Sequence, residues 1–232
     1  MYAFSIENFK RSPDEVSYLM DLARERFRTL QAERPRLERL GVRVRFMGNL
    51  ALLPADVRAM CAQIELAEPP ADAPPERLCL QMAVSYTTSD ELASALGELH
   101  SAVRDGRLLQ SDVSAELLER ALYTPADPPP ELVIRTSGET RLSDFLVWQA
   151  SRAGAELEFV DAFWPEFSAW QFYSALFRFL LRRNPTLAAN QKSCIERSSS
   201  SEEASRIERI ELFLTQLQTD RLELLRKEVP SS

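Results

Sequence analysis

Residues 134–143 read IRTSGETRLS, and apolar residues precede and follow them. The run LVI at 132–134 is typical of a short buried strand, whereas DFLVWQ at 144–149 fits a helix over 143–151. The stretch therefore indicates a strand, a polar loop with two arginines, and a helix. Because the same order recurs along the chain, this stretch decides the fold class.

Further apolar runs predict strands, and segments with helical periodicity separate them. The expected strands cover residues 2–4, 42–47, 78–86, 132–134 and 156–160. The run at 78–86 is mostly apolar, which is typical of a strand buried on both faces. The expected helices cover 13–40, 54–68, 90–103, 112–122, 143–151 and 172–183.

Strands that alternate with helices predict an α/β fold, in which helices flank a mostly parallel central sheet. The arginine loop then follows the carboxyl end of a strand, which is where open α/β sheets bind ligands. We expect one domain over 1–184, a polar linker over 185–204 and an extra C-terminal amphipathic helix over 205–229. That helix either packs back on the domain or binds a partner.

The composition excludes several classes of function. A net charge of -7 argues against a general nucleic-acid binder, which needs a basic face. The three cysteines lack the paired spacing of zinc motifs, and His100 is the one histidine, so a histidine-based triad is not expected. No apolar run approaches the roughly 20 residues of a membrane span.

The arginine loop has the residue types of a diphosphate site. Arg135 and Arg141 suit two-point recognition of phosphate, and Ser143 is a candidate N-cap whose helix would present amides to an anion. Gly138 permits a tight turn, and Glu139 can orient an arginine. The alternative is that both arginines pair with carboxylates and only hold the loop in place.

A second polar cluster follows the first strand. Ser5, Asn8 and Arg11 come directly after residues 2–4, so the same edge of the sheet can present them. The alternative is that Ser5 and Asn8 only build a turn. The sequence SPDE at 12–15 is a capping box that begins a helix.

Three segments together resemble the cis-prenyltransferase family, which includes undecaprenyl and eukaryotic dehydrodolichyl diphosphate synthases. They are YAFSIENFKR at 2–11, IRTSGETRLSDFLVWQ at 134–149 and FWPEF at 163–167. The resemblance extends from residue 2 to about 183 and is strongest to the eukaryotic catalytic subunits. The arginine motif is specific in both the identity and the spacing of its residues.

The resemblance implies repeated addition of isopentenyl diphosphate to farnesyl diphosphate, which builds a polyprenyl diphosphate for glycosyl-carrier lipid. It implies Mg²⁺ as cofactor and a peripheral position on the cytosolic face of the endoplasmic reticulum membrane. It further implies a heteromer with a non-catalytic sister subunit, or a homodimer. Catalytic roles carry over to Ser5, Asn8 and Arg11.

The family's isopentenyl diphosphate site carries over to the arginine loop. The matching residues are Arg135, Glu139, Arg141 and Ser143. The growing chain needs an apolar tunnel, and the apolar stripes at 16–23 and 57–64 either line it or belong to the ordinary core.

The sequence departs from the family pattern at four places. The family's Asp-Gly-Asn-Arg-Arg loop, whose aspartate binds magnesium, does not occur in this sequence. We therefore assign no metal ligand, and we expect that upstream sequence is missing. Ser89 stands where relatives usually carry arginine, the segment 151–158 aligns ambiguously, and an Arg-x-Gly motif is not seen. A non-catalytic partner subunit and a truncated pseudoenzyme are therefore the alternatives. We expect that the chain alone does not elongate farnesyl diphosphate.

Overall fold

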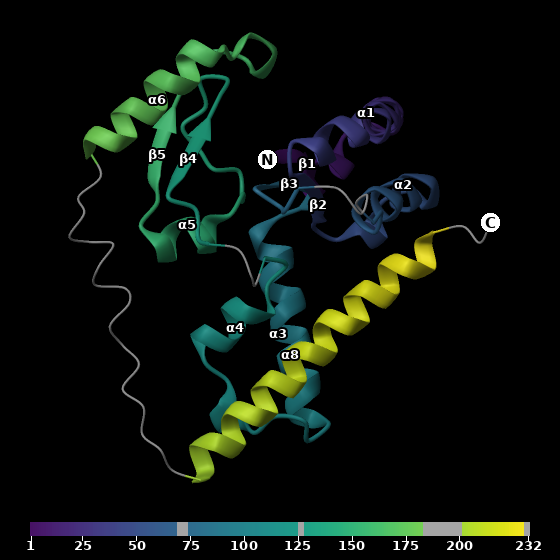
Figure 1. Cartoon of the computed structure of the whole chain (residues 1–232), viewed down its shortest axis with the longest axis vertical. Coiled ribbons are helices and arrows are strands. Elements are labelled where there is room, and N and C mark those ends of the chain that lie inside the picture. The colour runs from purple at the N-terminus through teal and green to yellow at the C-terminus, as the bar shows by residue number, and fades with distance from the viewer. Residues whose placement is uncertain (69–73, 125–127, 183–200, 230–232) are drawn as a thin grey trace. The chain divides into compact units, whose positions relative to one another are not determined.

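The structure, a computed structural model, describes residues 1–68, 74–124, 128–182 and 201–229. The chain divides into two compact units, one formed by Met1–Pro125 with Glu208–Ser232 and the other by Ala126–Ile207. Both units contain parallel strands with helices beside them (Figure 1). No described helix is long and apolar enough to cross a membrane.

The first unit is built on a three-stranded parallel sheet. Its strands β1 (Tyr2–Ser5), β2 (Val42–Met47) and β3 (Leu78–Tyr86) lie in the order β1-β3-β2. The prediction that the central strand is buried on both faces is wrong for its first half. Only the last four residues of β3 are buried, because β1 is short and pairs with β3 from Ala83 onward.

Two helices cover the core of this sheet. The helices α1 (Pro13–Arg39) and α2 (Ala55–Glu65) pack on it through buried residues that include Phe27, Phe46 and Cys61. The predicted capping box at the start of α1 is confirmed, since the Glu15 amide donates to Ser12 Oγ and the Ser12 amide donates to the Glu15 carboxylate. The segment Leu50–Leu52 forms a short 3-10 helix before α2.

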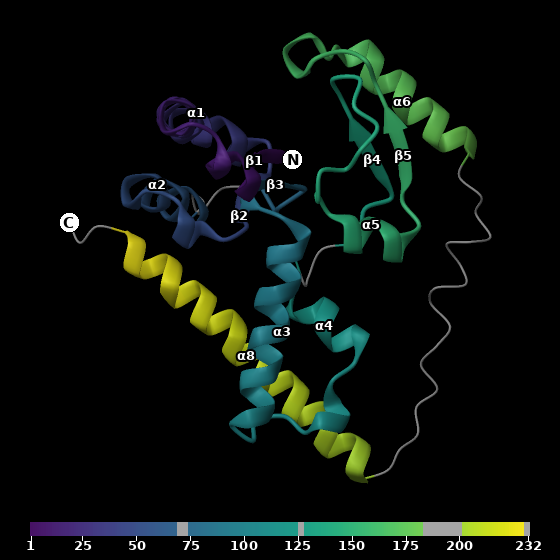
Figure 2. The same ribbon diagram turned by 180° about the vertical axis from the view of Figure 1, so that it is seen from behind.

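The remaining helices of the first unit pack on one another. They are α3 (Thr88–Arg104), α4 (Ala115–Ala121) and the C-terminal α8 (Ser201–Glu228), which belongs to this unit from Glu208 onward. In both views α8 crosses α3 at an angle (Figures 1 and 2). Of the two alternatives for this helix, the structure supports packing back on the domain. Residues 201–204, which we expected in the linker, begin the helix, and their acidic side chains favour a helix N-terminus.

The second unit contains the arginine loop. Its strands β4 (Leu132–Arg135) and β5 (Glu156–Phe159) are parallel, and the helices are α5 (Val147–Ala153) and α6 (Ala169–Arg182). The nearly buried Glu158 carboxylate accepts from Arg178 and Arg182, so β5 and α6 are tied together by charge-assisted hydrogen bonds. A 3-10 helix over Trp164–Glu166 precedes α6.

Candidate functional site

The arginine loop leaves the carboxyl end of β4 and is held by the chain that leaves β5. The Val160 amide donates to Arg135 O at 2.8 Å, and the Gly138 amide donates back to Val160 O at 3.1 Å. The Ser137 amide donates to Ala162 O at 2.8 Å. Three backbone hydrogen bonds therefore fix the first residues of the loop, as expected for a site on a rigid scaffold.

The loop turns through consecutive left-handed residues. Ser137 and Gly138 have φ values of 71° and 66°. A Cβ at Gly138 would lie 3.6 Å from the Asp161 carboxylate, which is ordinary contact, so this glycine is needed for its backbone conformation more than for space. The turn displays the next residues of the loop beyond the end of the strand.

The two arginines of the loop have different surroundings. Arg135 is half-buried, and its Nε is a buried atom with no hydrogen-bond partner among the described residues. Arg141 is exposed, with 71% of its side chain accessible, and its Nη1 lies 2.8 Å from the Glu139 carboxylate. An exposed pair of this kind is weak, so it orients Arg141 without removing it from a ligand's reach.

The expectation that Ser143 caps a helix over 143–151 is wrong. Ser143, Asp144 and Leu146 have φ values of 50°, 57° and 49°, and α5 begins only at Val147. The residue at the N-cap position is Leu146, whose side chain makes no capping hydrogen bond. Left-handed residues other than glycine cost about 1–3 kcal/mol each and cluster at functional sites. The segment after Arg141 is therefore strained instead of helical.

The N-terminal cluster forms a self-bonded turn in the first unit. The Ser5 amide donates to Asn8 Oδ1 at 2.8 Å, and the Glu7 amide donates to Ser5 Oγ at 3.1 Å. These bonds cap a 3-10 helix over Ile6–Lys10 that follows β1 directly. Ser5 and Asn8 therefore build a turn at the carboxyl end of β1, and their catalytic role stays a prediction.

Arg11 and Phe9 complete this cluster in different ways. Arg11 lies 4.0 Å from Glu15 in an exposed ion pair, so it too remains accessible to a ligand. Phe9 packs edge-on against Phe4, with ring centroids 4.9 Å apart, and anchors the turn on the core.

Sequence reasoning missed a buried polar network beside this turn. Tyr86, which pairs with Ser5 in the sheet, donates to the Glu91 carboxylate at 2.6 Å, and the Tyr123 amide donates to the same carboxylate at 2.8 Å. Ser85 is the extra residue of a β-bulge at this point and has a φ of 52°. The sequence carried no signal for this network, because a glutamate within an amphipathic helix is usually exposed.

The sequence-predicted residues thus form two sets. Ser5, Asn8 and Arg11 lie together in the first unit, whereas Arg135, Glu139, Arg141 and Ser143 share one loop of the second unit. In the described part of the chain, no group of three or more His, Cys, Asp or Glu side chains is arranged to hold a metal ion. Near the loop, the Glu139 carboxylate pairs with Arg141, and the Glu158 carboxylate accepts from Arg178.

Comparisons with known proteins agree on one family. The family model described as "Putative undecaprenyl diphosphate synthase" matches residues 1–185. The human dehydrodolichyl diphosphate synthase complex subunit DHDDS is 41% identical over 197 residues, which are 85% of this chain and 57% of the human protein. A tritrans,polycis-undecaprenyl-diphosphate synthase of Pyrococcus abyssi is 40% identical over 182 residues, 78% of this chain and 66% of that protein.

A solved structure gives the same result. The crystal structure of a probable undecaprenyl diphosphate synthase from Campylobacter jejuni matches with a TM-score of 0.63 and 31% identity, over 79% of this chain and 80% of that one. The chain spans between half and three fifths of the human and mouse relatives, 57% and 52% of their lengths. The family model, the sequence identities and the matching fold lead to the same conclusion: the chain belongs to the cis-prenyltransferase family of undecaprenyl and dehydrodolichyl diphosphate synthases.

Proposed function

We propose that this protein is a cis-prenyltransferase that adds isopentenyl diphosphate to an allylic diphosphate, farnesyl diphosphate, and so makes a long polyprenyl diphosphate. The observation that carries the proposal is the arginine loop, which places two arginines without a strong ion pair beyond the carboxyl end of β4. Relatives of this kind are named as polyprenyl diphosphate synthases.

In this proposal the loop binds the diphosphate of isopentenyl diphosphate. Arg135, whose Nε has no protein partner in the described residues, supplies a fixed donor, and Arg141 closes over the ligand from the exposed side. Guanidinium groups form paired, charge-assisted hydrogen bonds with phosphate oxygens. Glu139 restricts Arg141, and the hydroxyl of Ser143, held in a strained turn, adds a further contact.

The N-terminal turn is proposed to lie at the reacting ends of the substrates. Ser5 and Asn8 supply hydroxyl and amide groups there, and Arg11 supplies positive charge. An allylic cation needs a site from which water is excluded, because water would capture it. The buried bonds of Tyr86 with Glu91 keep this edge of the sheet rigid.

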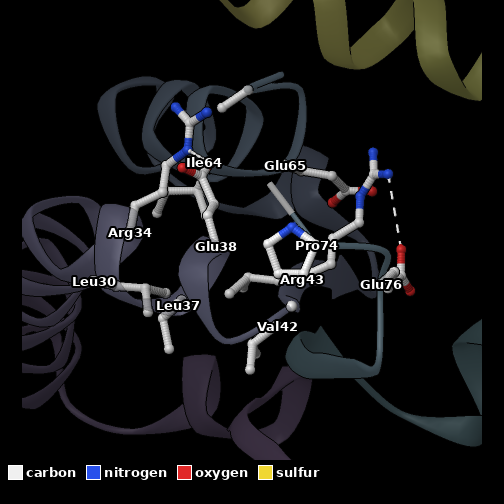
Figure 3. Close-up of a pocket in the computed structure, with 13 residues that line it drawn as sticks. Leu30, Arg34, Leu37, Glu38, Val42, Arg43, Ile64, Glu65, Pro74 and Glu76 are labelled. Carbon is white, nitrogen blue, oxygen red and sulfur yellow. Dashed lines mark hydrogen bonds and ion pairs between the residues drawn. The ribbon is translucent and has the colours of Figure 1, made fainter. Parts of the chain in front are cut away.

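The prenyl chain is proposed to extend between α1 and α2, over the sheet. The faces of Val16, Leu19, Met20 and Ala23 on α1, and of Val57, Met60 and Ile64 on α2, meet in the apolar core there. At the amino end of β2, a cavity of about 90 Å³ lies beside this core (Figure 3). Its apolar walls include Leu30, Leu37 and Ile64, and charged residues such as Arg43 and Glu76 stand at its rim.

Several further properties are proposed on the relatives alone. Mg²⁺ is the expected cofactor and would neutralise the charge of the departing diphosphate. The described residues do not form its site, so we derive no step through it. The human relative is named a complex subunit, and we propose a heteromer with a sister subunit, peripheral at the endoplasmic reticulum membrane, that serves glycosyl-carrier lipid synthesis.

The alternative of a non-catalytic partner subunit is disfavoured by the loop itself. Such subunits are expected to lose the loop arginines, whereas Arg135 and Arg141 are both present here. The test is steady-state kinetics of the full-length protein, purified with any subunit it binds. Arg135→Ala should raise KM for isopentenyl diphosphate and lower turnover, while Arg28→Ala, an exposed arginine on α1, should change neither. Unchanged kinetics in Arg135→Ala would remove the diphosphate site from this loop.

A further inference from the structure

The helix α2 is held firmly on one side only. Its inner residues Val57, Cys61 and Ile64 are buried in the core against α1 and the sheet. Two polar contacts join it to α1: Arg24 binds the Asp56 carboxylate through Nε and Nη2 at 2.5 and 3.1 Å, and Gln31 donates to Gln63 at 3.0 Å. These contacts fix the register of α2 along α1.

The outer side of α2 faces a cavity. The space measures about 380 Å³ and is bounded by α2, the carboxyl end of β2, α3 and the last two turns of α8. Its walls include Phe46, Arg58, Ser94, Tyr123, Leu222 and Leu225. Protein interiors are close-packed, so a space of this size beside a core helix leaves that helix room to move outward.

The helix α8 forms the far wall of this cavity and is anchored by Asp112 and by the segment that follows α4. Arg209 binds Asp112, whose side chain is 0% exposed, with two hydrogen bonds of 3.0 Å. Arg221 donates to the backbone carbonyls of Ala121 and Leu122, both at 2.7 Å, and lies over the Tyr123 ring at 5.4 Å. The side chains of Phe213, Leu214 and Leu217 are buried on the same face.

An ion pair connects the end of α8 to α2. Glu228 Oε1 lies 3.1 Å from Arg58 Nε, and Arg58 Nη1 also donates to Leu53 O at 2.8 Å. The pair is partly exposed and contributes little stability by itself. Its effect is geometric, because it ties α2 to a helix that Arg209 and Arg221 hold against the buried Asp112 and the end of α4.

We propose that the cavity behind α2, closed by α8, sets the length of the prenyl product. The inference rests on the proposed function, in which α2 forms one wall of the space for the growing chain. As the prenyl chain lengthens, α2 moves outward into the cavity, and the Arg58–Glu228 pair limits that movement. Arg58 and Glu228 are positioning residues in this account and touch no substrate.

The proposal gives opposite expectations for two kinds of variant. Arg58→Glu separates α2 from α8, so the dominant product should lengthen by at least one isoprene unit. The exchange Arg58→Glu with Glu228→Arg restores opposite charges and should restore the original length. Leu225→Trp fills the cavity from α8, so the product should shorten by at least one unit.

The experiment measures chain length and total incorporation of isopentenyl diphosphate together, in the full-length protein with any subunit it binds. Controls on α8 are Glu223→Arg, the same charge reversal at an exposed position, and Leu212→Trp on an exposed face outside the cavity. Both controls should keep the wild-type length. If the wild-type protein incorporates no isopentenyl diphosphate, the proposed function is refuted. If all variants incorporate it and make products of the same length, only the role of α8 is refuted.

Discussion

The arginines of α8 and those of the loop after β4 show two opposite uses of one residue type. Arg209 donates two hydrogen bonds to the buried Asp112, and this contact raises the pKa of Arg209 further above its usual value. Arg135, by contrast, keeps a buried Nε without a hydrogen-bond partner in the described residues. The first arrangement completes the fold, whereas the second leaves donor capacity for a ligand.

The same contrast holds for backbone conformation. The contacts of α8 are made from regular helix, and Phe213, Leu214 and Leu217 on it are buried. The loop after β4 contains Ser137, Ser143, Asp144 and Leu146 with positive φ values. Backbone strain of this kind persists where the surrounding structure imposes it, and such strained residues are frequent at functional sites. Stability and ligand binding should therefore respond to different arginines.

The largest expected effect on stability is that of Asp112→Ala. The substitution removes the buried partner of Arg209 and an acceptor of the Leu109 amide, and we expect a loss of about 3 kcal/mol in the free energy of unfolding. Urea unfolding followed by circular dichroism measures it. A loss below about 0.5 kcal/mol would contradict the structural role of the α8 arginines.

Arg135→Ala should show the reverse pattern. Loss of charge-assisted hydrogen bonds to a diphosphate should weaken binding by about 2 kcal/mol, or roughly thirtyfold in Kd. Unfolding should change by less than about 0.5 kcal/mol, because no described partner depends on the side chain. A strong loss of stability with unchanged affinity would place Arg135 with the structural arginines.

Glu139→Gln should have a smaller effect on the same site. The exposed pair with Arg141 contributes little, so we expect a change in Kd of about two- to fivefold, corresponding to less than about 1 kcal/mol. The change should diminish at high salt, because salt screens exposed pairs. Equal effects at low and high salt would show that Glu139 acts by another route.

The smallest expected effect concerns pH. Burial raises the pKa of Glu65, whose carboxylate accepts from the Phe46 amide at 2.9 Å. An acid with a raised pKa in the folded state binds more protons than the unfolded chain, so stability falls as the pH rises through and above the ordinary glutamate value. Glu65→Gln should flatten this part of the stability curve. An unchanged curve would contradict the shift.

The parts of the fold that follow from local rules could be predicted from sequence. The capping box at Ser12 and the parallel strands β2 and β3 follow from short-range spacing and apolar patterning. The start of α5 could not be predicted. After Arg141, several residues have positive φ values, and the sequence there does not specify that backbone conformation. The packing of α8 depends on pairs about a hundred residues apart, such as Arg209 with Asp112.

The candidate site was predicted in part for the same reason. The loop residues were recognisable because they are contiguous, and the contact of Glu139 with Arg141 is local. The buried network of Tyr86, Glu91 and Tyr123 was not recognised, because a carboxylate inside a helix gives no sign of burial in the sequence. The binding roles of Ser5, Asn8 and Arg11 stay predictions.

The measurement that tests the central claim most directly is calorimetric titration of the protein with isopentenyl diphosphate. The account predicts saturable binding that Arg135→Ala and Arg141→Ala each weaken, and that Arg28→Ala leaves unchanged. Inorganic pyrophosphate should compete, because the loop recognises the diphosphate group. Equal affinity in the wild type and both loop variants would contradict the account and would return these arginines to a role in holding the loop.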